Sequence, residues 1–553
     1  MRQISIRVNA EKETGKLLHD WRYIGYDECN YTYTPEGREQ LSRFGKLPDA
    51  PYFVRTHFLF CTGNCLGSFK FGSTNVYTED RDGNPVYDFE YVDRIMDTIL
   101  ETGNKPFVEM GFMPMDLVDR GYLRPSRGIW DDYGHYKDLG WSCPPKDYAK
   151  WHAFIHEVCA HLKERYGENE VNGWYFELWN EPDIFYWSGT AAEYCRLFDY
   201  TENAFHSVLP DARLAGPAVT GIFPGTNSEA FFRFFLEHCR RGTNYCDSST
   251  GTRLDFITFH TKGGGFPFDL HAKKAVPSVE RLVFQVDQGM KIIEEFGYGD
   301  LEVVLSEADP DGWAAGGIHD NPNMVFRNTE YYASYVASAF EKIGRLSKKY
   351  ETPIRPLSWA FMFPGERCFE GTRTFSTQGI DKPVFNLFRM YSRLGDRSLE
   401  FSCDGAKDLE ESIRESDVNG TFDTGNYTGE GEDTDISGFA ACGEDGIIRI
   451  LAYSHNNDRD MHEENELSVT VSGLPDGTVR VRHFRIDRDH SNACTVWKAL
   501  GEPLFPEGDE YAAIKARDGL EELEEASEMG TEGGALRICF RMPAHAVSLI
   551  EIG

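Results

Sequence analysis

Short apolar segments that alternate with amphipathic helical patterns fill residues 21–395 of this chain. Each segment is rich in β-branched or aromatic residues and ends in polar ones, which is typical of a buried parallel strand. Strands that alternate with helices indicate a parallel α/β architecture, and eight such units predict a (β/α)8 TIM barrel. The predicted strands lie at residues 21–25, 53–60, 105–111, 174–179, 213–216, 254–260, 301–306 and 357–363.

The sequence pattern changes at about residue 396. Short β-rich segments separated by Gly, Asp and Pro then predict an antiparallel β-sandwich. Residues 1–10 alternate between apolar and polar side chains, so we expect residues 1–20 to add a strand to that sandwich. The expected domains are therefore residues 1–20 as an N-terminal strand, residues 21–395 as the barrel and residues 396–553 as the sandwich. A loop is expected over residues 404–434, and a helix in the charged segment 509–533.

Two of the predicted strands end in the same way. The fourth leads into Asn180-Glu181-Pro182, and the seventh leads into Glu307-Ala308-Asp309-Pro310. Because parallel strands of a barrel end at one face, the two glutamates should lie close together. Paired carboxyl groups are what glycoside hydrolysis requires, since one protonates the leaving oxygen while the other attacks the anomeric carbon or activates water. The tryptophans beside Glu181 should raise its pKa toward that of a general acid.

Simpler interpretations of both glutamates stay open at this point. Glu181 could end a strand and only pair with a basic neighbour, and Glu307 could be a loop carboxylate that caps a helix. The repeated pattern of apolar strand, glutamate and proline favours the catalytic interpretation, because each of the simpler ones explains only one strand end.

The charge of the chain narrows the range of partners. Its 553 residues carry a net charge of −33, so they lack the basic footprint that nucleic acids and anionic membranes require. No transmembrane stretch and no apolar signal-peptide core are visible. The thirteen cysteines lack paired zinc-ligand spacing, so we expect reduced thiols, a cytoplasmic location and neither a metal nor a cofactor.

Longer motifs resemble glycoside hydrolase family 39, a family of retaining barrel enzymes that includes β-xylosidases and α-L-iduronidases. The resemblance extends over nearly the whole chain. The general family motifs are Arg55 with His57, Lys105–Glu109, Phe112–Pro114, Pro144–Tyr148, Phe176–Pro182 and Gly379–Pro383. The stretches that resemble the α-L-iduronidases more closely are Val54–His57, Glu237–Tyr245, Arg253–Gly263, Glu307–Trp313, Gly473–Gly477 and Trp497–Phe505.

The resemblance implies roles for the residues at the strand ends. Glu181 would be the acid/base and Glu307 the nucleophile of a two-step retaining reaction, and Asn180 would bind the sugar 2-hydroxyl. His57 is implied at the substrate, with His260 in a supporting role.

Arg55 is implied as a second supporting residue. Arg55 and His57 alternate on one strand, so they point to the same face. Inside the barrel, Arg55 would keep the nucleophile ionised. On the outer face it would form a structural ion pair, and the sequence leaves both positions open.

Cationic residues decide which sugar is expected. A uronic acid has a carboxylate, and burying it requires a paired cation. Lys262, in the sequence His-Thr-Lys-Gly-Gly, is similar to a lysine that binds the iduronate carboxylate in the α-L-iduronidases. Arg373, in Gly-Thr-Arg-Thr-Phe, is similar to a second cationic residue of those enzymes. The other residues implied at the substrate are Asp309, Gly312, Trp313 and Glu366.

The expected function is exo-hydrolysis of terminal α-L-iduronic acid from glycosaminoglycan-derived oligosaccharides of the dermatan or heparan type. The alternative is a β-xylosidase or another neutral-sugar glycosidase of the same family, which would have no use for Lys262 and Arg373 together. A non-catalytic sugar-binding relative is disfavoured because both glutamates are present.

Overall fold

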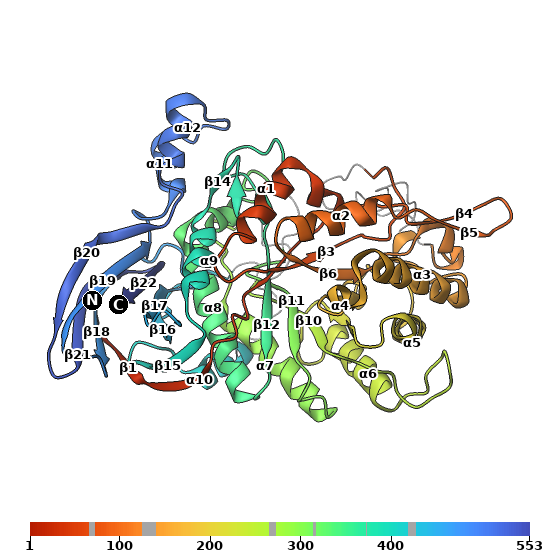
Figure 1. Cartoon of the computed structure of the whole chain (residues 1–553), viewed down its shortest axis with the longest axis horizontal. Coiled ribbons are helices and arrows are strands. Elements are labelled where there is room, and N and C mark those ends of the chain that lie inside the picture. Colours follow the sequence, from red (N-terminus) through yellow and green to blue (C-terminus); the bar gives the residue numbers. More distant parts are fainter. Residues whose placement is uncertain (66–71, 124–139, 265–271, 313–316, 372, 419–426) are drawn as a thin grey trace.

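A computed structural model describes residues 1–65, 72–123, 140–264, 272–312, 317–371, 373–418 and 427–553. A helix-covered barrel forms the larger part, and a curved sheet that holds both termini lies against one side of it (Figure 1). The barrel strands are β2 (Tyr23–Tyr26), β3 (Phe53–Thr56), β6 (Lys105–Met110), β7 (Tyr175–Leu178), β8 (Arg213–Ala215), β9 (Pro217–Val219), β10 (Ile257–Lys262), β11 (Val303–Asp309) and β12 (Ile354–Trp359).

The barrel closes at its fifth strand, which Gly216 divides into β8 and β9. β8 pairs in parallel with β7, while β9 pairs in parallel with β10, so the two halves join the two sides of the sheet. The predicted (β/α)8 barrel is confirmed, and the predicted C-terminal β-sandwich corresponds to a separate β-sheet domain. Glu181 follows the fourth barrel strand, and Glu307 lies on the seventh.

Helices cover the outside of the barrel and follow the strands in turn (Figure 1). The predicted helix at residues 148–166 has the same bounds in the structure, because the Asp147 side chain caps its first turn and Gly167, at φ +84°, ends it. The helices of this part are α1 (Pro35–Phe44), α2 (Glu90–Glu101), α3 (Tyr148–Tyr166), α4 (Glu168–Val171), α5 (Ala191–Val208), α6 (Asn227–Arg241), α7 (Val279–Glu295), α8 (Glu330–Lys349), α9 (Pro383–Arg393) and α10 (Leu409–Val418).

The interior of the barrel is filled in layers. Residues two positions apart on a strand point to the same face. A residue two positions after an inward-facing residue of the lowest layer therefore also points inward. That places Arg55, Glu109 and Glu177, which are fully buried, directly above the lower layer. Arg55 therefore lies inside the barrel. The lower layer is apolar and consists of Tyr23, Phe53, Phe107, Tyr175, Ala215, Phe256, Val304 and Leu357.

The second domain is one continuous sheet of strands that are mostly antiparallel. β1 adds to it from the N-terminus, because residues 3–9 pair with β18 and β1 also pairs with β15. Ile4, Ile6 and Val8 alternate inward and join its separate hydrophobic core. Its strands are β1 (Gln3–Lys16), β15 (Arg397–Cys403), β16 (Asp435–Cys442), β17 (Ile448–His455), β18 (Glu464–Ser472), β19 (Gly477–Ile486), β20 (Glu521–Thr531), β21 (Ala535–Pro543) and β22 (Ala546–Ile552).

Polar pairs connect the sheet domain to the helices of the barrel. Lys342 on α8 forms a buried ion pair with Asp435 of β16, and the Tyr453 hydroxyl donates to the same carboxylate at 2.9 Å. At α7, the Lys407 ammonium lies 2.9 Å from Glu280. Because such buried charges are costly to separate, they fix the orientation of the domain on α7 and α8.

Two local predictions for the residues after 395 are wrong. Residues 404–434 were expected to be a loop, but they contain α10, which packs on α7. A helix was expected in the charged segment 509–533, but α12 (Gly508–Lys515) covers only its start, and residues 521–531 form β20. Arginines of β19 face the glutamates of β20, and Arg482 Nε donates to Glu522 at 2.8 Å. These cross-strand pairs override the helical pattern.

Two bulk features of the chain can be compared with the structure. All thirteen cysteines are free thiols, most of them buried in the cores. In the described parts of the chain, every helix is too short or too polar to cross a bilayer.

Candidate active site

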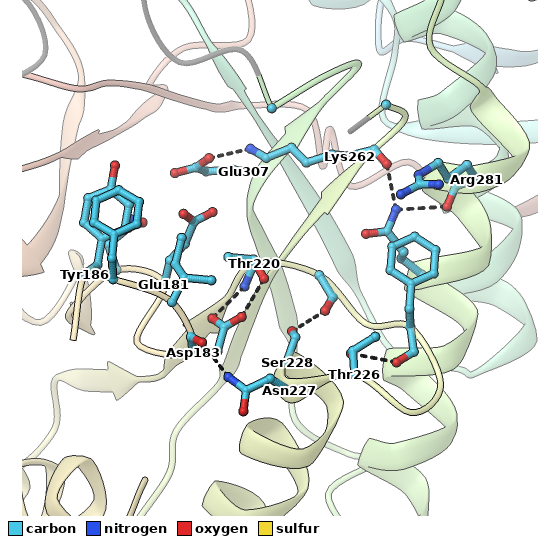
Figure 2. A pocket seen from close by; sticks show the side chains of 18 of the residues that line it. Glu181, Asp183, Tyr186, Thr220, Thr226, Asn227, Ser228, Lys262, Arg281 and Glu307 are labelled. Carbon is cyan, nitrogen blue, oxygen red and sulfur yellow. Dashed lines mark hydrogen bonds and ion pairs between the residues drawn. The ribbon is translucent and has the colours of Figure 1, made fainter. Parts of the chain in front are cut away.

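A pocket of about 410 Å³ opens at the carboxyl ends of the barrel strands. Loops after β7, β9, β10, β11 and β12 contribute to its wall, which is where parallel α/β barrels place their active sites. Figure 2 shows Glu181 and Glu307 with their carboxyl groups in the same space. The lining residues are Asp27, His57, Asn180, Glu181, Asp183, Ile184, Phe185, Tyr186, Thr220, Gly221, Phe223, Thr226, Asn227, Ser228, Lys262, Gly264, Arg281, Gln285, Glu307, Gly312 and Arg373.

The two glutamates face each other across this pocket. Oxygens of their carboxyl groups and a ring nitrogen of His260 all lie within 4.8 Å of one another. His260 Nδ1 lies 2.9 Å from Glu181 Oε1 and 3.7 Å from Glu307 Oε2. Glu181 has a positive φ of +44°, a conformation that non-glycine residues seldom adopt, and its N–H donates to the Ala218 carbonyl at 2.9 Å. Backbone strain of this kind concentrates at functional sites.

Positive charge surrounds Glu307. Burial alone would raise the pKa of this carboxyl group, but His260, Lys262, His57 and Arg373 together hold it well below its usual range. Lys262 forms an ion pair with Glu307 Oε2, and His57 Nε2 lies 3.5 Å from Oε1. Glu307 is therefore a carboxylate at neutral pH, as a nucleophile must be.

Arg55 is the centre of a buried charge network beneath the pocket. Its guanidinium lies 2.7 Å from Glu177, 3.0 Å from Glu109 and 3.5 Å from Glu307. Burial opposes the charge of Arg55, but Glu177, Glu109 and Glu307 outweigh it and raise its pKa. Burial also raises the pKa of Glu109 well above its usual range, against the effect of Arg55. This network fixes the side chains directly beneath the pocket.

Asn180 is oriented by the same guanidinium. Arg55 Nη2 donates to the side-chain oxygen of Asn180 at 3.0 Å. Because that bond uses the amide oxygen, the NH₂ group of Asn180 keeps its capacity to donate to a ligand. Asn180 lines the pocket next to Glu181.

The two predicted substrate cations both line the pocket, and each lies near carboxylates of the protein. Besides Glu307, Lys262 Nζ lies 3.4 Å from Asp309. Arg373 lies 3.6 Å from Asp27 and 5.4 Å from the ring centre of Trp359. Burial lowers the pKa of Arg373, while Asp27 and Asp309 raise it by more.

Other predicted residues are distributed around the pocket and behind it. Gly312 lines it, whereas Trp313 lies outside the described residues. Asp309 is buried behind Lys262, 3.8 Å from Arg327. Glu366 is half-buried and lies outside the described lining, where its carboxyl accepts the Gly371 N–H. Its pKa is raised to about 7, because burial outweighs the attraction of Lys382.

Sequence reasoning missed several lining residues. Asp183 accepts from Thr220 N at 3.0 Å and from the Thr220 hydroxyl at 2.5 Å, and burial raises its pKa to about 6. Its place two residues after Glu181 was a signal that could have identified it. Asp27 and Arg281 come from the first strand's loop and from α7, and their sequence neighbourhoods contain no comparable motif.

The group of Glu181, His260 and Glu307 has donor atoms close enough to hold a metal ion. Lys262 and Arg55 are already in ion-pair contact with Glu307, however, and His57 adds a ring nitrogen. A dication placed there would be repelled by the lysine and the arginine. The set therefore fits proton transfer and nucleophilic attack better than metal binding.

Comparisons with known proteins agree with this geometry. The sequence model for Glycosyl hydrolases family 39 matches residues 4–528. The chain is 25% identical over 542 residues to a β-xylosidase of Caldicellulosiruptor saccharolyticus, covering 96% of this chain and 92% of that protein. It is 22% identical over 579 residues to the α-L-iduronidase of Mus musculus, covering 99% of this chain and 80% of that protein.

Solved structures show the same fold. A bacterial orthologue of human α-L-iduronidase superimposes with a TM-score of 0.75 at 19% identity, covering all of this chain and 84% of that one. A monomeric β-xylosidase from Caulobacter crescentus CB15 also gives 0.75, at 21% identity, with 100% and 99% covered. At such identities the likeness concerns the fold alone, but the family match extends over most of the chain. The chain therefore belongs to glycosyl hydrolase family 39 and is a glycoside hydrolase.

Proposed function

We propose that this glycoside hydrolase removes terminal α-L-iduronic acid from glycosaminoglycan-derived oligosaccharides of the dermatan or heparan type, with retention of configuration. The observation that carries the proposal is the pair of carboxyl groups, with oxygens within 4.8 Å, beside two cations in one pocket. Retaining glycosidases hold their carboxyl groups about 5–5.5 Å apart, whereas inverting ones leave about 6.5–9.5 Å for a water molecule. The short separation favours direct attack.

In the first step, Glu307 attacks the anomeric carbon and forms a glycosyl ester, while Glu181 gives its proton to the departing oxygen. Glu181 then takes a proton from water, and the water oxygen displaces Glu307 from the anomeric carbon. His260, at 2.9 Å from Glu181, positions that carboxyl group. Asn180 donates to the sugar 2-hydroxyl from beside the acid.

The uronic acid assignment rests on Lys262 and Arg373. Both line the pocket close to Glu307: Lys262 ends β10, and Arg373 lies after β12. With a net charge of −33, the chain repels anionic sugars unless cations are concentrated where the sugar binds. In the bound complex, the substrate carboxylate would share Lys262 with Asp309 and receive the planar fork of Arg373.

A β-xylosidase is the second candidate, and one contact favours it. Lys262 is already paired with Glu307 and Asp309, so its charge can serve the nucleophile without any substrate carboxylate. The β-xylosidase and α-L-iduronidase relatives also have similar identities to this chain. A panel of aryl glycosides that includes α-L-iduronide and β-D-xyloside separates the two candidates, because they predict opposite preferences.

Lys262→Ala tests the same point inside the pocket. Loss of a partner for a buried carboxylate should lower kcat/KM on the iduronide by at least about a hundredfold, near the lower end of the cost of breaking buried ion pairs. The loss on a neutral aryl glycoside should be much smaller. Because Lys262 helps to depress the pKa of Glu307, the acid limb of the pH–rate profile should also move to higher pH.

The control for this variant is Lys291→Ala, which removes an exposed lysine paired with Asp287 on α7. It should behave as wild type on every substrate. Equal losses on both glycosides for Lys262→Ala, or a wild type that hydrolyses xylosides and not iduronides, would establish the xylosidase alternative.

Glu181→Gln tests the acid role through the leaving group. The formation of the glycosyl-enzyme should slow by about 10²–10⁴-fold for poor leaving groups, which need protonation. Dinitrophenyl glycosides should be nearly unaffected in that step, because their leaving group departs as a stable anion. Pre-steady-state rates for a series of aryl glycosides give the dependence. A loss that is equal for good and poor leaving groups would remove Glu181 from this role.

A further inference from the structure

The pocket extends beyond the two glutamates toward α7 and residues 220–228, which form the loop after β9 and the start of α6. Figure 2 shows Arg281 across the pocket from Glu181, with Thr226 and Ser228 below the space between them. This part of the wall is less buried than the part around Glu307: Phe223 and Arg281 are partly exposed, and Asn227 is exposed. It therefore forms the outer part of a pocket whose deep end holds His57, Glu307 and Arg373.

The position of the acid indicates which sugar each part holds. A leaving oxygen departs toward the group that protonates it. Glu181 is joined to the 220–228 side of the pocket, since its N–H donates to Ala218 and the neighbouring Asp183 accepts from Thr220. The deep end thus suits the terminal sugar, and the outer part suits the sugar that leaves.

Hydrogen bonds hold the backbone of Arg281 in this outer part. It lies near the start of α7, where the Ser278 hydroxyl caps its N–H at 3.1 Å. Its guanidinium carbon lies 4.6 Å from the centre of the Phe223 ring. Gln285 donates to the carbonyl of Arg281 at 3.0 Å and to that of Lys262 at 2.7 Å, which ties α7 to the end of β10. An aromatic ring beside a planar cation suits a sugar that has an anionic group.

We propose that Phe223 and Arg281 form the binding site for the leaving sugar, and that Arg281 pairs with a sulfate ester on it. The proposal rests on the proposed function through the acid role of Glu181. Burial lowers the pKa of Arg281 to about 10, which still leaves the guanidinium charged at neutral pH. Sulfate offers oxygens that match the N–H groups of the guanidinium fork.

The test compares two disaccharides that share the terminal sugar the enzyme hydrolyses best. One has an unsulfated N-acetylhexosamine as leaving sugar, and the other has the same hexosamine with an O-sulfate. Wild type should have the higher kcat/KM on the sulfated one. Arg281→Gln should lose about tenfold to a hundredfold on the sulfated disaccharide, in keeping with the loss of a charge-assisted pair, and much less on the unsulfated one. Arg281→Lys keeps the charge but lacks the guanidinium fork, so its kcat/KM on the sulfated disaccharide should lie between those of wild type and Arg281→Gln.

The matched control is Arg241→Gln, which removes one exposed arginine from the end of α6 outside the described pocket lining. It should leave the preference for sulfate as in wild type. A wild type that does not prefer the sulfated disaccharide, or an Arg281→Gln variant that loses equally on both, would overturn the proposal.

Direct binding separates this proposal from the proposed function. Calorimetry with free N-acetylglucosamine 6-sulfate should show binding to wild type and at least about tenfold weaker binding to Arg281→Gln. If iduronides are not hydrolysed but this difference is found, the leaving-sugar site stands and the uronic acid assignment fails. If iduronides are hydrolysed and wild type and Arg281→Gln do not differ in binding or in kinetics, the uronic acid assignment stands and the leaving-sugar site fails.

Discussion

Glu307→Gln should lower kcat by at least about 10³-fold, as expected when a group that acts only in the transition state is removed. The amide is isosteric with the carboxylate, so the fold should be kept, but no anion remains to attack the anomeric carbon. A 2-deoxy-2-fluoro glycoside should label wild type at Glu307 and leave the variant unlabelled by mass spectrometry. Glu307→Gly should regain turnover with azide and release a glycosyl azide.

The matched control is Glu302→Gln, one residue before β11 begins and at the opposite end of the barrel. Glu302 is paired with Arg213 at 2.9 Å and with Arg355 at 3.2 Å, outside the pocket. This variant should keep most of the activity. Near-normal turnover in Glu307→Gln would assign the nucleophile to another residue.

Arg55→Met should destabilise the protein by about 3–5 kcal/mol, the usual cost of leaving buried charges without their partner. The variant lacks the guanidinium that pairs with Glu109, Glu177 and Glu307, so these three carboxyl groups would lose their shared cation in the barrel interior. Activity should fall as well, because Asn180 loses the bond that orients its amide. Urea unfolding at pH 7 measures the first effect, and steady-state kinetics measures the second.

The pH dependence of this effect has a defined sign. In wild type the pKa of Glu307 is depressed, so its interactions stabilise the fold above the ordinary glutamate pKa and are lost as the pH falls through the depressed value. In the variant, the buried carboxyl groups lack their cation, so their pKa values rise and protonation favours the folded state. The difference in unfolding free energy between wild type and Arg55→Met should therefore become smaller as the pH falls from 7 to 5.

The control for Arg55→Met is Arg38→Met, which removes an exposed arginine paired with Glu101. Exposed pairs contribute at most about 1 kcal/mol, so this change should have little effect on unfolding. Two results would contradict the network described for the barrel interior. One is an equal loss of unfolding free energy in both variants, and the other is a loss in Arg55→Met, relative to wild type, that grows toward pH 5.

Periodicity alone predicted much of the barrel. Runs such as Trp174–Leu178 are apolar because parallel strands are buried on both faces, and helix patterns such as residues 148–166 bury only one side. The helix prediction was wrong for residues 521–531 because their glutamates fit a helix surface as well as an edge strand. Only the neighbouring arginines of β19 decide between the two, and they are distant in the sequence.

The sequence by itself determined that two glutamates lie at the ends of parallel strands, because strand direction and spacing follow from local pattern. It did not determine what surrounds them. Packing between distant segments sets the contact of Lys262 with Glu307 and the burial of Asp309 outside the described pocket lining. It also brings Asp27 and Arg281 into the pocket wall. Electrostatic effects fall with distance and depend on burial, so only the tertiary structure decides which charges a pocket offers to a substrate.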